Sequence, residues 1–281
     1  MNLILLLLIM KKLKVMNDSN KNIFKIFFII IIIKMIIIIP LGGTGQRFKK
    51  NGYELPKALI EVDGLPILYY LLMNLNLKNV NFVYIPYNKE YKNYNFEVKL
   101  ENRFPEIIFK FLCLEEDTRG AAETLNIALK KLDTFYLDIP ILSLDSDSFY
   151  KVDVIEKWNG KDCVFSIIDK DEEAKYSYVQ IDKLMNEYII DIKEKVKISD
   201  YACTGAYGFE SVGKLINFTN LMITNNSMQK NEFYTSGVIK MMIEKNYKFK
   251  NTTIELKDFI SLGTPEQVQD YLINRKLLIV D

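Results

Sequence analysis

The chain has 281 residues, and 49% of them are apolar, which is enough for the core of one large domain or two small ones. Lysine and arginine total 37 against 36 aspartates and glutamates, so the net charge of +1 provides no basic field of the kind that binds nucleic acid. The sequence contains no histidine, which excludes histidine general bases, Ser-His-Asp triads and histidine-ligated zinc and leaves carboxylates, cations and a bound metal for any catalysis.

The first 34 residues stand apart from the rest. They contain two apolar runs, at residues 3–10 and 26–33, and each is shorter than the roughly 20 apolar residues that a membrane helix needs. A membrane helix built on the second run would have to include residues 36–39. The loop that follows requires these residues as its supporting strand. We therefore expect residues 1–34 to be a non-core extension from an upstream start of the reading frame, and residues 35–281 to be the functional domain. A membrane anchor, and membrane contact with it, is the alternative.

A glycine-rich loop follows an apolar strand at residues 35–40. Its sequence, LGGTGQRF, lets backbone N–H groups approach a phosphate closely, and Arg47 adds a cation just beyond the glycines. It is not a Walker A loop, since GxxxxGK(S/T) occurs nowhere in the chain, nor a dinucleotide fingerprint, since Phe48 stands at the third glycine position. The residues expected to bind a nucleotide here are Leu41, Gly42, Gly43 and Gly45. A plain strand-to-helix turn with surface cations is the alternative.

A second cation lies close behind this loop. Lys57 follows Pro56, ten residues after Arg47, so that two side-chain cations can converge on one triphosphate. Residues 58–62 are typical of a short extended segment, and residues 66–75 are typical of a helix opened by proline.

Strands and helices then alternate. Residues 81–87 and 107–113 are aromatic and β-branched enough for strands, residues 120–132 repeat apolar side chains at helical spacing, and residues 139–145 predict a further buried strand. This pattern predicts an α/β fold, a Rossmann-like three-layer sandwich whose mixed central sheet is mostly parallel. Ligands of such folds bind at the carboxyl ends of the strands, where the glycine loop lies.

The pattern changes in the second half of the chain. Closely spaced apolar segments between residues 162 and 193 predict antiparallel hairpins, which would form a small substrate-side portion. Helical stretches return at residues 212–223 and 233–244, and the capping sequence TPEQ opens a last helix at Thr264. No repeat or flexible linker interrupts this order, which favours one continuous domain.

The strand predicted at residues 139–145 brings two aspartates to the edge of the sheet: Asp145, its last residue, and Asp147 just beyond it. Alternate residues of an extended chain point the same way, so Asp145 and Asp147 can both address one hard cation, Mg²⁺ or alternatively Mn²⁺. A turn carboxylate that only accepts hydrogen bonds from backbone N–H groups is the other interpretation.

These motifs, in this order, resemble the sugar-1-phosphate nucleotidylyltransferases, which are NTP-transferases with a glycosyltransferase-A-like fold. In that family the first strand leads into a G-x-G-x-R-(F/L) loop and a downstream Pro-Lys pair, whose Arg and Lys bind the NTP phosphates. The resemblance implies those roles for Arg47 and Lys57. It also implies that Asp147, followed by Ser148 and Phe149, holds the Mg²⁺ that bridges the nucleotide and the sugar phosphate. The catalytic residues so implied are Arg47, Lys57 and Asp147.

Two further segments resemble substrate motifs of the family. Residues 117–125, DTRGAAETL, are similar to its G-T-A segment, which implies that Gly120 faces the nucleotide, while Arg119 is either a third phosphate contact or a surface residue. Residues 192–209 resemble its E-K-P and T-G-x-Y-x-F pair, with Val196 in place of the proline. The sugar-phosphate-binding residues so implied are Glu194 on the hydroxyls, Lys195 on the phosphate, Thr204 and Gly205. A solvated, lysine-rich hairpin is the alternative for this segment.

One position departs from the family pattern. FISLGTPEQV, near the end of the chain, resembles W-x-D-I-G-T-P, in which the aspartate is a second metal ligand, and Ser261 stands at that position here. A weaker metal site, a ligand from Asp145 and a different metal geometry are the open alternatives.

The resemblance implies an enzyme that joins an NTP to a sugar 1-phosphate or a related phosphorylated metabolite and releases pyrophosphate, in capsule or other surface-glycan synthesis. No nucleic acid is expected as a partner, and a homo-oligomer is left open. Three separated cysteines without CxxC spacing indicate reduced thiols in a cytoplasmic protein. The alternatives are a glycosyltransferase, with Asp145-Ser146-Asp147 as its DxD metal motif, and a noncatalytic nucleotide-sugar sensor, which Ser261 would suit.

Overall fold

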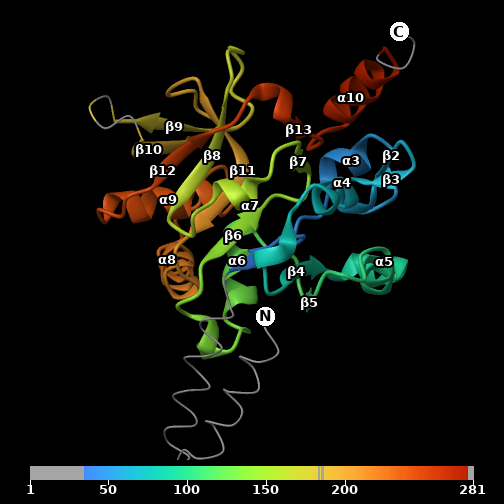
Figure 1. The fold of residues 1–281 in the computed structure, drawn as a ribbon, viewed down its shortest axis with the longest axis horizontal. Helices are drawn as coiled ribbons and strands as arrows, with labels where there is room; N and C mark the ends of the chain where they lie inside the picture. The colour runs from blue at the N-terminus through green and yellow to red at the C-terminus, as the bar shows by residue number, and fades with distance from the viewer. Residues whose placement is uncertain (1–34, 183, 185–186, 278–281) are drawn as a thin grey trace, which may run out of the picture. The chain divides into compact units, whose positions relative to one another are not determined.

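The computed structural model describes residues 35–182, 184 and 187–277, and the predicted extension at residues 1–34 lies outside them (Figure 1). The strands are β1 (Ile36–Ile38), β2 (Glu61–Val62), β3 (Leu65–Pro66), β4 (Val83–Asn88), β5 (Phe109–Leu114), β6 (Ile141–Leu144), β7 (Ser148–Tyr150), β8 (Cys163–Ile168), β9 (Ser177–Ile181), β10 (Ile189–Glu194), β11 (Tyr201–Phe209), β12 (Lys250–Thr253) and β13 (Phe259–Ser261). The α-helices are α3 (Gln46–Lys50), α4 (Ile67–Met73), α5 (Phe96–Arg103), α6 (Ala121–Leu129), α7 (Val154–Lys157), α8 (Val212–Thr224), α9 (Thr235–Glu244) and α10 (Pro265–Leu277). None of the described helices is long and apolar enough to cross a bilayer.

The central sheet has a parallel half and an antiparallel half. Its strand order is β10-β9-β11-β6-β1-β4-β5, with β8 paired to β11 and β12 paired to β8. β1 runs parallel to β4 and β6, and β5 continues the parallel half beside β4. β11 runs antiparallel to β6, β8 and β9. The predicted Rossmann-like α/β fold with an antiparallel portion is confirmed.

Side chains of the central strands pack on both faces of the sheet. Ile37 joins the core that contains α4 and α5, whereas Tyr84 in β4 donates its hydroxyl hydrogen bond to the Ala128 carbonyl in α6 at 3.0 Å. On that second face α6 also contacts α8, where Asn126 Nδ2 donates to Thr219 Oγ1 at 3.0 Å. The isoleucines of β1 are fully buried, and each such side chain stabilises the fold by about 2 kcal/mol. The glycine loop therefore starts from a rigid strand between two helical layers.

Most predicted elements are confirmed within a few residues, and three local features differ. Of the strands between residues 162 and 193, only β9 and β10 pair as a hairpin, since β8 pairs with β11 and β12. Residues 58–62 do not form one extended segment, because a 3-10 turn at Lys57–Leu59 precedes β2. The turn is closed by Leu59, whose N–H donates to the Pro56 carbonyl at 2.8 Å. The pair β7–β13 was not predicted, since three-residue strands are too short to show a period of two.

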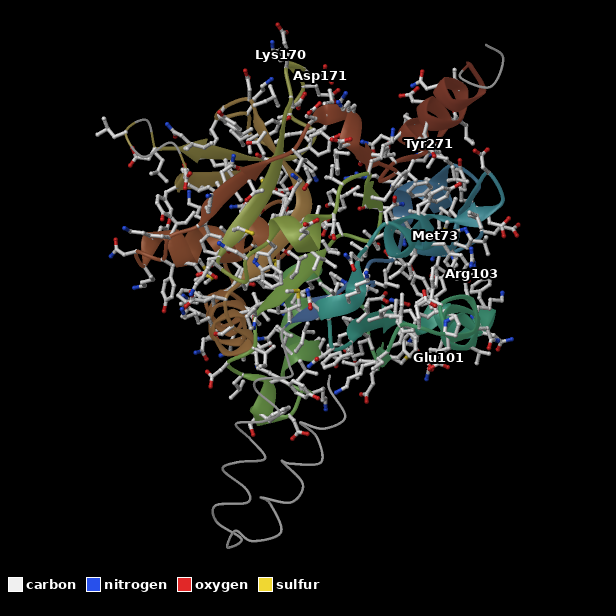
Figure 2. All side chains as sticks on the ribbon, viewed as in Figure 1. Met73, Glu101, Arg103, Lys170, Asp171 and Tyr271 are labelled. Carbon is white, nitrogen blue, oxygen red and sulfur yellow. The ribbon has the colours of Figure 1, made fainter. Side chains whose placement is uncertain are left out.

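The last helix is attached to the core through aromatic contacts. Tyr271, labelled in Figure 2, belongs to α10. Its ring centroid lies 6.3 Å from that of Tyr70 and 6.0 Å from that of Phe149. Tyr70 belongs to α4 and Phe149 to β7, so α10 is held beside the strand that follows the acidic pair. The first turn of α10 contributes Glu266 and Gln267 to the lining of a cavity described below.

Candidate active site

A cavity of about 1330 Å³ is lined by residues from both halves of the sheet. Pockets for one small molecule typically measure about 300–1,000 Å³, so this volume has room for two substrates. The predicted site residues that line it are Arg47, Lys57, Asp145, Asp147, Glu194, Lys195, Thr204 and Gly205. The predicted residues that do not line it are Leu41, Gly42, Gly43, Gly45 and Gly120, although Ala121, next to Gly120, does.

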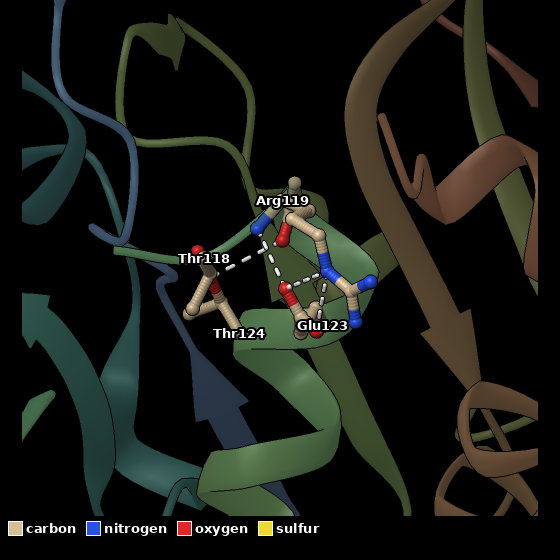
Figure 3. Close-up of polar contacts among 5 residues, drawn as sticks. Thr118, Arg119, Glu123 and Thr124 are labelled. Atoms are coloured by element: carbon tan, nitrogen blue, oxygen red, sulfur yellow. Dashed lines mark hydrogen bonds and ion pairs between the residues drawn. The ribbon is translucent and has the colours of Figure 1, made fainter. Parts of the chain in front are cut away.

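The three loop glycines meet different structural demands. Gly42 packs against the hydroxyls of Thr118 and Thr124, which hydrogen-bond to each other at 2.7 Å (Figure 3). An added Cβ at Gly42 would lie 2.2 Å from Thr124 Oγ1, so only glycine allows this approach. Gly45 has a φ of 66° directly before α3, whereas Gly43 is exposed with open space around it. Neither packing nor backbone conformation therefore requires a glycine at position 43.

The two ends of the glycine loop are placed differently. Leu41 is buried, and its backbone N–H and carbonyl bond the Pro86 carbonyl and the Asn88 N–H at 2.7 and 3.0 Å. These bonds fix the loop to the end of β4. At the other end, Arg47 lies in the first turn of α3, is exposed and lines the cavity. The backbone of the loop is thus fixed by hydrogen bonds, while the long side chain of Arg47 carries its positive charge to the cavity.

Lys57 and Asp147 form an ion pair across the cavity, although 90 residues separate them in sequence. Both side chains are partly exposed, at 26% and 23%. The Lys57 ammonium also lies 5.8 Å from the centroid of the Phe48 ring. The cation behind the glycine loop and the acidic pair after β6 therefore face each other, as a site for a triphosphate and a divalent cation requires.

Asp145 lies deeper in the same site. Its backbone N–H donates to the Gly205 carbonyl at 2.9 Å, and Gly205, with a φ of 84°, leaves space for its carboxylate. Desolvation raises the pKa of Asp145, and the negative charge of Asp147 adds to the rise, while Lys57 opposes it. Positive charge brought to this carboxylate pair would therefore be stabilised strongly.

The predicted sugar-phosphate residues gather on the antiparallel side. Glu194 accepts hydrogen bonds from the hydroxyls of Ser177 and Ser236, the latter at 3.0 Å. Lys195 has a φ of 51°, and its ammonium lies 3.8 Å from Glu194 Oε1 and 3.3 Å from the Tyr234 hydroxyl. A proline at residue 196 would disfavour an α-region conformation at Lys195, so Val196 is compatible with this backbone.

Thr204 lines the cavity, but its hydroxyl serves the fold. Its Oγ1 donates to the Phe165 carbonyl at 3.2 Å, and its own carbonyl accepts a hydrogen bond from the Tyr150 hydroxyl at 2.8 Å. Only 2% of Thr204 is exposed. The Thr204 side chain therefore forms part of the cavity wall, while its hydroxyl is already hydrogen-bonded within the protein.

Ser261 lies beside Asp147, at the end of β13. It is paired with Ser148 in the β7–β13 ladder, and the next residue, Leu262, donates its N–H to the Asp147 carbonyl at 2.7 Å. Ser261 Oγ donates to Gln267 Oε1 at 3.2 Å. The position that departs from the family pattern is therefore adjacent to the predicted metal ligand.

The donor set suits a hard cation that also binds phosphate. Mg²⁺ in proteins is commonly held by one or two carboxylates together with substrate phosphates and water, and Asp145 and Asp147 both line the cavity. Within residues 35–182, 184 and 187–277, no group of three or more Asp, Glu, His or Cys residues is arranged to hold a metal ion. The pair therefore fits a cation that arrives with a nucleotide better than a closed structural metal.

Arg119, for which the sequence left two interpretations open, pairs with Glu123 in α6 and does not line the cavity, which favours the surface interpretation (Figure 3). Lys230 and Tyr234 line the cavity, yet neither belongs to a motif with recognisable spacing. Lys230 lies just before the helical stretch predicted at residues 233–244, and Tyr234 lies within it, although α9 begins only at Thr235.

Two known proteins are similar to this chain in sequence. A D-glycero-alpha-D-manno-heptose 1-phosphate guanylyltransferase from Campylobacter jejuni is 23% identical over 246 residues, which cover 85% of this chain and 100% of that protein. A protein of the same name from Aneurinibacillus thermoaerophilus is 26% identical over 120 residues, 43% of this chain and 49% of its own length.

Solved structures share the fold. A nucleoside-diphosphate-sugar pyrophosphorylase from Vibrio cholerae superposes with a TM-score of 0.74 at 21% identity, covering 84% of this chain and 99% of that one. The CTP:phosphocholine cytidylyltransferase of Streptococcus pneumoniae superposes with a TM-score of 0.66 at 15% identity, covering 86% of this chain and 99% of that one. The sequence model of the nucleotidyl transferase family matches residues 36–268. The chain therefore belongs to the nucleotidyl transferase family.

Proposed function

We propose that this nucleotidyl transferase joins an NTP to a sugar 1-phosphate, or to a related phosphorylated metabolite, and releases pyrophosphate for surface-glycan precursor synthesis. The proposal rests on one observation: Arg47 and Lys57 share a single cavity with the acidic pair and with Lys195. Such a cavity can hold two anionic substrates and neutralise both. GTP and a heptose 1-phosphate are the first pair to test, because both similar proteins are named heptose 1-phosphate guanylyltransferases.

The reaction needs no histidine. A phosphate monoester is already an anionic nucleophile, and its oxygen attacks the α-phosphorus of the NTP while the bond to the α,β-bridging oxygen breaks. Pyrophosphate leaves with the bonding electrons. The protein must align two anions that repel each other, which Arg47 and Lys57 do on the triphosphate and Lys195 does on the acceptor phosphate. Glu194 accepts hydrogen bonds from acceptor hydroxyls.

Asp147 and Asp145 are the residues that would hold Mg²⁺, or Mn²⁺ in its place. The bound cation would supply positive charge at the phosphate oxygens. Lys57 pairs with Asp147 in this structure. With a cation held by the two aspartates, the Lys57 ammonium would be free to bind the triphosphate.

We also propose that residues 35–281 constitute the enzyme and that it works in the cytoplasm. Cys113, Cys163 and Cys203 are free thiols, which supports a reducing compartment. Residues 35–281 group into one compact unit, which supports the proposed domain.

Four NTPs should be incubated with a panel of sugar 1-phosphates and other phosphorylated acceptors, and pyrophosphate release measured. We expect Mg²⁺-dependent release with one NTP and one class of acceptor, and loss of release when EDTA removes the metal. The control omits the acceptor. Transfer from a preformed nucleotide sugar would support the DxD glycosyltransferase instead, and nucleotide binding without turnover across the whole panel would support the sensor.

Ser261→Asp should strengthen metal binding. The substitution adds a carboxylate beside Asp147, and affinity for hard cations rises with the number of charged oxygen ligands, so we expect Mn²⁺ to bind about tenfold more tightly in the presence of nucleotide. Calorimetry with Mn²⁺ measures the effect. Ser261→Asn adds similar bulk without charge and serves as the control. Equal Mn²⁺ affinity in Ser261→Asp and the wild type would show that residue 261 is too far from the cation to bind it.

A further inference from the structure

A loop before α9 is attached to the turn that we expect to face the nucleotide. The strap comprises residues 228–236, which are the end of this loop and the first two residues of α9. At Phe233 it passes the turn: the Phe233 N–H donates to the Arg119 carbonyl at 2.8 Å, and the Phe233 carbonyl accepts from the Ala122 N–H at 2.9 Å. Gly120 has a φ of 135°, and an added Cβ would lie 2.5 Å from the Phe233 carbonyl oxygen. The strap is therefore fitted closely to the turn.

Side-chain contacts reinforce this attachment. The Arg119 guanidinium lies 4.8 Å from the centroid of the Phe233 ring. Glu123 holds that guanidinium in place, with Arg119 Nε donating to Glu123 Oε1 at 3.0 Å (Figure 3). Arg119 thus connects the strap to the first turn of α6. This structural role accounts for an arginine that does not line the cavity.

The other end of the strap reaches the predicted acceptor residues. The Tyr234 hydroxyl accepts a hydrogen bond from the Lys195 ammonium at 3.3 Å, and the ammonium lies 5.2 Å from the Tyr234 ring centroid. Two residues later, the Ser236 hydroxyl donates to Glu194 Oε2 at 3.0 Å. Burial raises the pKa of Tyr234, and the charges of Glu232 and Glu194 raise it further, so the phenol stays neutral. A neutral phenol hydroxyl can accept a hydrogen bond from the Lys195 ammonium without neutralising its positive charge, which stays available for a phosphate.

We propose that Tyr234 is a positioning residue for the acceptor phosphate: it holds Lys195 toward the cavity, from a strap that is anchored on the nucleotide turn. This inference rests on the proposed function, since it assumes that Lys195 binds the acceptor. A lysine ammonium on a four-carbon stem has many rotamers, and a phenol that restricts them lowers the entropy lost when the phosphate binds. Because the strap contacts both the turn at Gly120 and Lys195, it links the position of the acceptor-binding lysine to the turn that we expect to face the nucleotide.

Tyr234→Phe tests this role, because it removes one oxygen and keeps the ring. We expect the KM for the acceptor to rise about tenfold, as for the loss of one hydrogen bond to a charged group, with the KM for the NTP nearly unchanged. Tyr247→Phe is the matched control: a lysine, Lys214, lies 5.1 Å from that ring centroid, but Tyr247 does not line the cavity. Its kinetic constants should equal those of the wild type.

A double-mutant cycle with Lys195→Ala separates positioning from a general structural effect. If Tyr234 acts through Lys195, Tyr234→Phe should not lower kcat/KM for the acceptor further once Lys195 is alanine. The same fold-loss in both backgrounds, or an acceptor KM within twofold of the wild type in Tyr234→Phe, would overturn the proposal. Absence of turnover in the wild-type enzyme would instead refute the proposed function, so the two failures are distinguishable.

Discussion

Asp147→Asn should lower kcat by about two to three powers of ten, the scale of a lost electrostatic stabiliser in a water-poor site. Asparagine keeps the size of the side chain and removes the charge that pairs with Lys57 and that we assign to the cation. The acceptor KM should change much less than kcat. Pyrophosphate release gives the rate, and Mn²⁺ binding in the presence of nucleotide should weaken in parallel.

Asp153→Asn is the matched control for this variant. Asp153 caps α7, with its Oδ1 accepting from the Ile155 and Glu156 N–H groups at 2.9 and 3.1 Å, and it does not line the cavity. Asparagine caps helices about as well as aspartate, so activity and stability should persist. Wild-type turnover in Asp147→Asn would remove Asp147 from the mechanism.

Gly205→Ala should reduce both stability and activity. The residue has a φ of 84°, and an added Cβ would lie 2.5 Å from Asp145 Oδ2 and 2.8 Å from Asp145 Cβ. The left-handed conformation and the clash together should cost about 2–4 kcal/mol of unfolding free energy. Displacement of Asp145 should also lower kcat by about tenfold to a hundredfold, because small misplacements in an active site have effects of this size. Urea unfolding and pyrophosphate release measure the two losses.

Gly64→Ala separates the two contributions at Gly205. Gly64 has a similar φ of 76°, but an added Cβ there would meet nothing within 4 Å. This variant should lose only about 1–2 kcal/mol from the conformational strain and should keep full activity. If Gly205→Ala behaved like Gly64→Ala, with stability reduced and kcat unchanged, the contact between residue 205 and Asp145 would have no role in the reaction.

Much of the fold could be predicted from local patterns. The apolar run before the glycines predicted β1, and the helical spacing of Ala122, Leu125 and Leu129 predicted α6, since both periodicities record which side chains are buried. The β7–β13 pair escaped prediction because each strand has three residues and its partner lies more than a hundred residues away. That pair places Ser261 beside Asp147, so the strand pair that was not predicted forms part of the candidate site.

The candidate site was predicted unevenly. Lys57 and Asp147 were predicted to serve one site, and both line one cavity. Their ion pair was not predicted, and their roles stay predictions. Arg119 could be interpreted in two ways, and the structure places it against Glu123 and Phe233, outside the residues that line the cavity. Tyr234 was missed because the helical stretch predicted at residues 233–244 included it, where an aromatic residue indicates packing, whereas α9 begins only at Thr235.

By itself, the sequence determined the kinds of element, the order of the motifs and the absence of histidine chemistry, because these depend on residue type and on near neighbours along the chain. The tertiary structure decided which of these residues share one cavity. Lys57, Asp147, Lys195 and Tyr234 come from four separate segments, and the crossovers and antiparallel returns of the sheet bring them together. Such contacts depend on packing between distant segments, which local sequence patterns do not encode.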